Sequence, residues 1–235
     1  MAAYESEITR FLRELKQQDP TIESGQREGR AIFDNLKKSV SYFLTHHVPE
    51  ITPYLGFIFL GLPLPMTVVL ILCIDLGTDM LPAIALGKER PESDILKQPP
   101  RPRHAHLING RLLFWAYGVL GMIESAAGFF AYFSVLSAGG WRWGQPLAGS
   151  DPLYHKAVSA FFAAVVLCQV ANGLLSRARR QSLLRQGLFS NHLLLAGIAT
   201  ELLLAWLIIQ WPVLQPWMGT ATLTWHELLL GAPFA

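Results

Sequence analysis

The chain has 235 residues, of which 51% are hydrophobic and only 15% are charged, and its formal net charge is +2. A soluble domain usually has about 25% charged residues, and a net charge so close to balance gives no reason to expect nucleic-acid binding. The charged residues gather in 1–41, 88–111 and 177–185, with long apolar stretches between them. This layout predicts an all-α, polytopic membrane protein rather than a soluble domain.

The polar residues 1–30 predict a short amphipathic helix at the N-terminus. Their apolar side chains fall on one stripe at helical spacing: Ile8, Phe11, Leu12 and Leu15. The Asp19-Pro20 step is expected to end this helix, because a residue before proline disfavours the helical conformation. No cleavable signal is expected, since the apolar residues alternate with charged ones.

Five apolar segments are predicted to cross the membrane as helices. They are residues 39–60, 66–86, 112–136, 157–175 and 192–211. A further segment, 223–235, is too short to cross a hydrocarbon core about 30 Å thick at about 1.5 Å per residue. The expected fold is therefore a polytopic membrane helix bundle of five full spans plus a truncated sixth.

Basic residues predict the orientation of these spans. Three segments, 1–41, 88–111 and 176–190, contain 17 of the 19 Lys and Arg residues, whereas the alternate loops contain only Arg142 and Lys156. Cytoplasmic loops are enriched in Lys and Arg. We therefore expect these three segments, and the N-terminus with them, to lie on the cytoplasmic side of the cytoplasmic (plasma) membrane.

Acidic residues occur within all but one of the predicted spans: Glu50, Asp75, Asp79, Glu124 and Glu201. An ionised side chain at the bilayer centre costs about 2.5–3.5 kcal/mol on insertion scales, and such residues usually face the bundle interior and serve a function. For Glu124 and Glu201, a protonated or internally hydrogen-bonded side chain remains an alternative. Gln169 and Asn172 are either interhelical hydrogen-bonding residues or part of an ion site.

Asp75 and Asp79 are difficult to explain by structure alone. They are four residues apart, so they share one face of a helix. Gly77 lies between them and can loosen the helix there. Two carboxylates on one face of one membrane span predict a site for a cation or a proton.

The preceding span supplies further oxygen ligands. Pro49 removes one helical hydrogen bond and frees the carbonyl of Thr45, and Glu50 follows the proline directly. Carboxylates and free carbonyls suit Na⁺, K⁺, Ca²⁺ or protons. His46 and His47 have no acid or cysteine at ligand spacing apart from Glu50, so no transition-metal site is expected there.

These motifs belong to a longer resemblance. Residues 28–98 are similar to the fifth and sixth membrane helices of Na⁺/K⁺- and H⁺/K⁺-type P-type ATPases, through the stretches IFDNLKKS, PEITP, LPLP, CIDLGTDM and ESDI. The similarity continues through NGRLLFWAYGVLGMIESAAGFFAYF and SRARRQSLLRQG. Residues 31–235 therefore resemble the C-terminal membrane domain of such a pump, from its fifth helix to the start of its tenth.

The resemblance implies which residues bind the transported cation. Glu50, Asp75 and Asp79 match cation-coordinating residues of the family, and Thr78 lies between the two aspartates. Further matches are a polar position of the eighth helix and an acid of the ninth: Gln169 and Glu201. Two positions depart from the family pattern: His46-His47 replaces a Ser-Asn pair, and Asn172 replaces an aspartate of the sodium pumps, which puts a third sodium site in doubt.

The chain lacks any match to the family's first four helices, its DKTGT motif, its TGE loop and its GDG hinge. The resemblance therefore implies a truncated, split or fused pump fragment with no catalytic residues, which alone is not expected to hydrolyse ATP. The ATP and Mg²⁺ that the family requires would act on missing domains. Expected partners are the lipid bilayer, Na⁺, K⁺ or H⁺, and a separately encoded N-terminal pump half, with no metal beyond the transported alkali cation and no nucleic acid.

Two other classes of function remain open: a stand-alone cation channel or carrier, and a membrane partner that modulates an intact pump. Residues 1–30 do not match the pump. Their stretches AYESEITRFLRELK and QREGRA resemble the beginning of an uncharacterised family of small bacterial proteins. We interpret this segment as being of foreign origin, joined to the pump sequence near the EGRA that both share.

Overall fold

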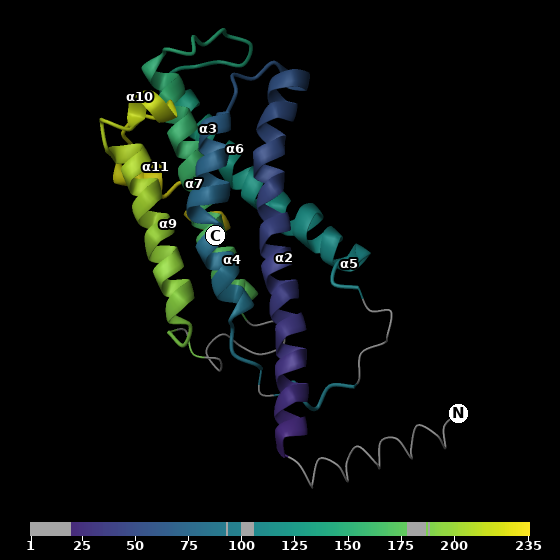
Figure 1. Ribbon diagram of the computed structural model, residues 1–235. Helices are drawn as coiled ribbons and strands as arrows, with labels where there is room; N and C mark the ends of the chain where they lie inside the picture. Colours follow the sequence, from purple (N-terminus) through teal and green to yellow (C-terminus); the bar gives the residue numbers. More distant parts are fainter. Residues whose placement is uncertain (1–19, 93, 100–105, 178–186, 188) are drawn as a thin grey trace.

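The computed structural model describes residues 20–92, 94–99, 106–177, 187 and 189–235, and every regular element in these ranges is a helix (Figure 1). The all-α class predicted from the sequence is confirmed. The stripe predicted for the N-terminal amphipathic helix lies outside the described residues. Helix α2 begins at Pro20, the position where the preceding helix was expected to end.

Helix α2 (Pro20–Leu60) is a single helix of 41 residues, although Pro49 and Pro53 lie inside it. Proline leaves the carbonyl four residues earlier without its helical partner, and membrane helices tolerate this where neighbouring helices cover the freed group. The helix ends at Gly61, whose φ of 63° is the left-handed conformation that glycine adopts without strain. The predicted turn 61–65 follows.

The second predicted span is helical but not uniformly so. It consists of α3 (Val68–Cys73), the π-helical turn η1 (Ile74–Thr78) and α4 (Met80–Gly87). Thr67 starts it as an N-cap, because its side chain accepts a hydrogen bond from the Leu70 amide. The third span has the same construction, with α5 (Gly110–Leu113), the π-helical turn η2 (Phe114–Leu120) and α6 (Gly121–Ala138).

Two uninterrupted helices follow, α7 (Pro152–Ser176) and α9 (His192–Gln210). Helix α7 starts about five residues earlier than predicted, so the loop between α6 and α7 is shorter than the expected 137–156. The reason is local: Asp151 accepts from the Leu153 amide and Pro152 is the first helical residue, which together make a favourable helix start.

Four of these helical segments are long and apolar enough to cross a membrane, so a polytopic helix bundle is confirmed. They are Val68–Gly87, Gly110–Ala138, Pro152–Ser176 and His192–Gln210. Helix α2 is not among them, and a crossing by its residues 39–60 remains a prediction. It nevertheless packs along α4 and α6 as one member of the bundle.

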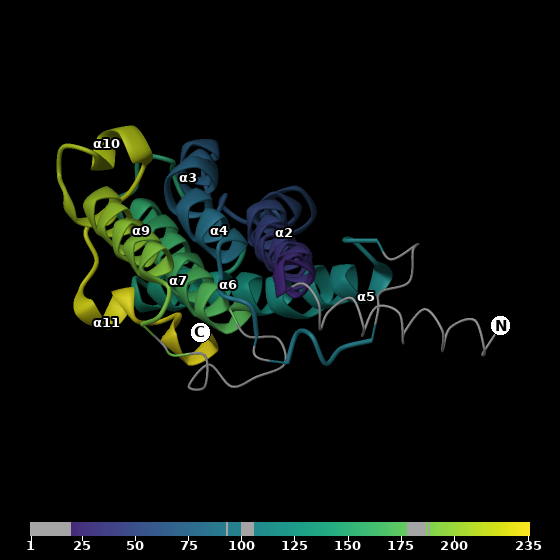
Figure 2. The same cartoon turned by 60° about the horizontal axis from the view of Figure 1, so that its bottom comes forward.

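Helix α7 lies at the centre of the bundle. It contacts α6 and α9, and Figure 2 shows it between them. Its residues 157–166 are almost completely buried. Gly128 of α6 allows a close approach, because a side-chain carbon added there would lie 2.7 Å from the ring of Phe161.

The C-terminal residues fold back onto this bundle in short turns: α10 (Gln215–Met218), α11 (Trp225–Leu228) and the 3₁₀ turn η3 (Ala232–Phe234). Gly231 packs against the backbone of Ala164 in α7, and the ring of Phe234 lies 5.5 Å from that of Phe130. The segment 223–235 therefore lies along the bundle, and its role as the start of a sixth span remains a prediction.

A network of buried charges ties the loops together at the end of the bundle opposite the 139–151 loop. Arg177 is fully buried, and its Nε donates to Oε2 of Glu89 at 2.9 Å. Asn191 donates to the same oxygen at 2.9 Å, and Ser190 accepts from Arg177 at 2.7 Å. The Lys38 ammonium donates to the Arg177 carbonyl at 2.6 Å, so the network joins α2 to the loops after α4 and α7.

Candidate cation-binding site

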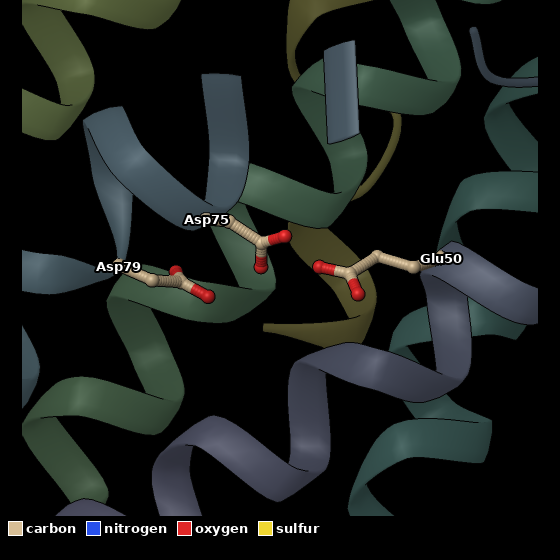
Figure 3. A group of neighbouring side chains, drawn as sticks. All are labelled: Glu50, Asp75 and Asp79. Carbon is tan, nitrogen blue, oxygen red and sulfur yellow. The ribbon is translucent and has the colours of Figure 1, made fainter. Parts of the chain in front are cut away.

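Three carboxylates from two neighbouring helices converge in the bundle. Each of Glu50, Asp75 and Asp79 offers a carboxylate oxygen, and these oxygens lie within 4.8 Å of one another. Figure 3 shows Glu50 reaching from α2 toward Asp75, with Asp79 beside it. Asp79 is 1% exposed and Glu50 7%, whereas Asp75 is only partly buried. The structure thus assembles the acids that the sequence predicted to act together, and their role in cation binding remains a prediction.

The π-helical turn η1 sets the spacing of the two aspartates. The Asp79 amide donates to the Ile74 carbonyl at 3.0 Å, five residues back instead of four. Gly77 lies inside this turn, as expected for a residue that loosens the helix. Turns of this kind often occur at functional sites, because the extra residue changes which side chains share a face.

Thr78 is buried beside these aspartates, but its hydroxyl is already engaged. It donates to the Ile74 carbonyl at 3.0 Å, which covers one of the carbonyls of the π-helical turn. Only the lone pairs of its oxygen are left to approach a cation. Thr78 therefore fits the predicted site as an acceptor.

The Thr45 carbonyl freed by Pro49 lies where α2 crosses α6. A side-chain carbon added at Gly121 would lie 2.8 Å from this carbonyl oxygen and 2.5 Å from the Val48 side chain. The Thr45 hydroxyl donates to Ser41 at 2.9 Å. The carbonyl thus borders the α6 side of α2.

On that side the structure places an ion pair that the sequence did not predict. Nδ1 of His46 lies 3.0 Å from Oε2 of Glu124, and both side chains are almost completely buried. Tyr42 packs on the His46 ring with centroids 4.2 Å apart and donates to Asp79 at 3.4 Å. Tyr42 was missed as a site residue, although it stands four residues before His46 and eight before Glu50, on one face of α2.

Three further predicted residues are buried without adequate partners. Among the described residues, no hydrogen bond reaches either carboxylate oxygen of Glu201 or either amide atom of Gln169. Asn172 accepts from Ser176 of its own helix at 3.2 Å, and its Nδ2 has no partner. Both interpretations of Gln169 and Asn172, as interhelical hydrogen-bonding residues or as part of an ion site, remain predictions.

Glu201 lies close to His46 and to Asp79 of the carboxylate cluster. Asp79, Glu124 and Glu201 all lie close enough to His46 to act on it electrostatically. A buried polar atom without a partner costs about 1–3 kcal/mol. Carboxylate, amide and hydroxyl oxygens at this density suit a hard cation or protons, and either would satisfy atoms that the protein leaves unpaired.

The fold defines a polytopic helical membrane protein with a buried polar cluster inside its bundle. A sequence profile described as "Cation transporting ATPase, C-terminus" matches residues 63–235, which is more than half of the chain. The chain belongs to this family. The resemblance to the C-terminal membrane region of P-type cation pumps is thereby confirmed.

Individual relatives agree with this assignment. The chain is 45% identical over 210 residues to the sodium/potassium-transporting ATPase subunit alpha-4 of Homo sapiens, with 79% of this chain and 20% of the relative covered. It is 42% identical, with the same coverage, to the alpha subunits of Tetronarce californica and Drosophila melanogaster. The chain thus spans about a fifth of the length of these relatives.

A second profile matches the other end of the chain. It covers residues 3–37 and is described as "Protein of unknown function (DUF3460)". The two profiles share no residue, which fits the resemblance of residues 1–30 to a different, uncharacterised family. The foreign origin of this segment remains a prediction.

Proposed function

We propose that the chain is the membrane module of a monovalent-cation-transporting P-type ATPase and that it contributes part of the ion-binding site. The observation that carries this proposal is the convergence of Glu50 from α2, Asp75 from the π-helical turn η1 and Asp79 from the residue that follows this turn. Three negative charges this close are strongly unfavourable in a poorly solvated bundle. A bound cation or protons relieve that repulsion. The names of the relatives indicate sodium and potassium as the cations.

The cluster is open on one side, which supports a partial site. Asp75 is only partly buried, and four residues within five positions of Glu50 or Asp75 along the chain are apolar and exposed: Ile51, Leu55, Leu72 and Leu76. An exposed apolar surface beside a polar site suits a further helix better than water. A separately encoded N-terminal pump half would supply such a helix, together with the domains that use ATP and Mg²⁺.

Reconstitution tests this proposal against the two alternatives. The purified chain in liposomes should neither hydrolyse ATP nor carry ⁸⁶Rb⁺ or ²²Na⁺ without ATP. Phosphoryl transfer needs a nucleophile and positioned phosphate-binding groups, which we assign to domains outside this chain. Flux without ATP would favour a stand-alone channel or carrier, and co-purification with a complete pump would favour a modulator. A vanadate-sensitive phosphoenzyme formed by the chain alone would contradict the assignment of phosphoryl transfer to domains outside this chain.

The proposal also gives the chain an orientation, with the loops after α4 and α7 in the cytoplasm and the loop between α6 and α7 outside. In whole cells, a membrane-impermeant thiol reagent should label Ser150→Cys and should not label Lys97→Cys. Both positions are in loops, and the native Cys73 and Cys168 lie within predicted spans. Lys97→Cys should become reactive once the membrane is permeabilised. Labelling of Lys97→Cys alone in intact cells would reverse the orientation.

A further inference from the structure

A polar cavity of about 400 Å³ lies between α2 and α5, away from the carboxylate cluster. In both views α5 lies beyond α2, on the side away from α7 and α9 (Figures 1 and 2). The cavity is lined by two basic side chains, two neutral polar ones and an aromatic and an aliphatic residue: Lys37, Arg111, Ser41, Asn109, Trp115 and Leu112.

The cavity lies at the level along the bundle where a membrane surface is expected. Arg111 is the second residue of the apolar segment Gly110–Ala138, and Lys37 lies two residues before the predicted first span. Trp115 is 50% exposed and Phe114 65%, so two large aromatic side chains stand at the same end of this segment. Aromatic and basic residues gather at the level of the lipid headgroups.

The chemistry of the lining suits a phosphate group. Lys37 and Arg111 are both cations, and none of the described residues that line the cavity is an acid. Asn109 uses its side-chain oxygen to accept from the Leu112 amide at 2.9 Å, so its NH₂ group is left as a donor. Ser41 adds a hydroxyl.

We propose that this cavity binds the phosphate headgroup of an anionic membrane lipid. Lys37 and Arg111 would hold the phosphate from α2 and α5, with Asn109 and Ser41 donating to its oxygens. The exposed faces of Phe114 and Trp115 continue from the cavity toward the membrane interior and would cover the upper part of the acyl chains. A free phosphate ion shares the headgroup chemistry but gains nothing from these aromatic faces.

Lipid-dependent thermal stability of the full chain in detergent tests the proposal. Added phosphatidylglycerol should raise the melting midpoint more than the same amount of phosphatidylcholine, and inorganic phosphate should have little effect. Lys37→Gln with Arg111→Gln should weaken the apparent affinity for phosphatidylglycerol roughly 30-fold, since each of the two basic residues at an anionic surface contributes about 1 kcal/mol. The matched control is Arg27→Gln with Lys88→Gln, which removes two exposed charges from the same predicted side.

Each outcome either supports or overturns the proposed lipid site. Loss of the phosphatidylglycerol response in the cavity variant, with the control unchanged, supports the site. An equal loss in both double variants would mean that general surface charge binds the lipid, and no loss in either would overturn the site. Full stabilisation by inorganic phosphate alone would overturn the assignment to a lipid. If the cavity variant does not fold, Trp115→Ala replaces it as the test. This variant should weaken the response to phosphatidylglycerol and leave the response to phosphatidylcholine unchanged. An unchanged phosphatidylglycerol response in Trp115→Ala overturns the site.

Discussion

Replacing Asp75 and Asp79 by asparagine should abolish the stabilisation of this protein by Na⁺ or K⁺. In the wild type, a cation at about ten times its dissociation constant should stabilise the folded chain by about 1.4 kcal/mol and raise the melting midpoint by about 3–6 °C. The effect should be larger near about pH 8 than near about pH 5.5, because protons compete with the cation for carboxylates. Thermal unfolding in detergent at both pH values measures it.

The double variant should lose both the cation response and its pH dependence. Its stability without added cation should equal or exceed that of the wild type, because two of three converging negative charges are gone. Glu23→Gln with Glu28→Gln is the matched control, since it removes two exposed acids far along α2 from the cluster. If the Asp75 and Asp79 variant responds to cations as the wild type does, these aspartates are not the site.

Replacing Arg177 by methionine should destabilise the chain by about 3–5 kcal/mol, the range for removing one partner of a buried ion pair. Both side chains of the Arg177–Glu89 pair are fully buried. Without the guanidinium, Glu89 loses a charged hydrogen-bond donor at 2.9 Å and keeps the neutral amide of Asn191. The melting midpoint should fall by about 10 °C. Lys88→Met, which removes an exposed charge next to Glu89, should have little effect.

A double replacement distinguishes the contribution of the ion pair to stability from that of the other contacts of Arg177. Arg177→Met with Glu89→Leu should recover much of the lost stability, because apolar residues of similar size often replace a buried pair at little cost. If the double variant is as unstable as Arg177→Met alone, the contribution of Arg177 comes from its contacts with the Gly187 carbonyl and Ser190 rather than from Glu89.

The same pair should make stability depend on pH in the acid range. Burial acts to raise the pKa of Glu89, but hydrogen bonds from Arg177 and Asn191 outweigh it and leave the pKa below its usual value. A carboxylate with a lowered pKa stabilises the fold above its unfolded-state pKa of about 4.3, and this stabilisation is lost as the pH falls through the folded-state pKa. Arg177→Met should lose this part of the acid dependence.

The sequence alone determined that this is an all-helical membrane protein, because long apolar stretches between charged segments leave few other structures possible. It also predicted that Asp75 and Asp79 act together, since residues four apart share a helix face. Gly77 indicated the loosened helix that became the π-helical turn η1. Asp151-Pro152 is a favourable helix start and indicates that α7 begins at Pro152. The apolar segment begins only at residue 157, so the start predicted from hydrophobicity was too late.

Contacts between helices were decided only by the tertiary structure. The His46–Glu124 pair joins residues 78 positions apart, and Arg177, counted in the sequence as a loop cation, is buried against Glu89 from 88 positions away. Gln169 is spaced like an interhelical hydrogen-bonding residue, yet its amide meets no described partner. Helical periodicity determines which side chains share one face of one helix. Which faces meet depends on how whole helices pack, as where Gly121 lets α6 approach Thr45 of α2.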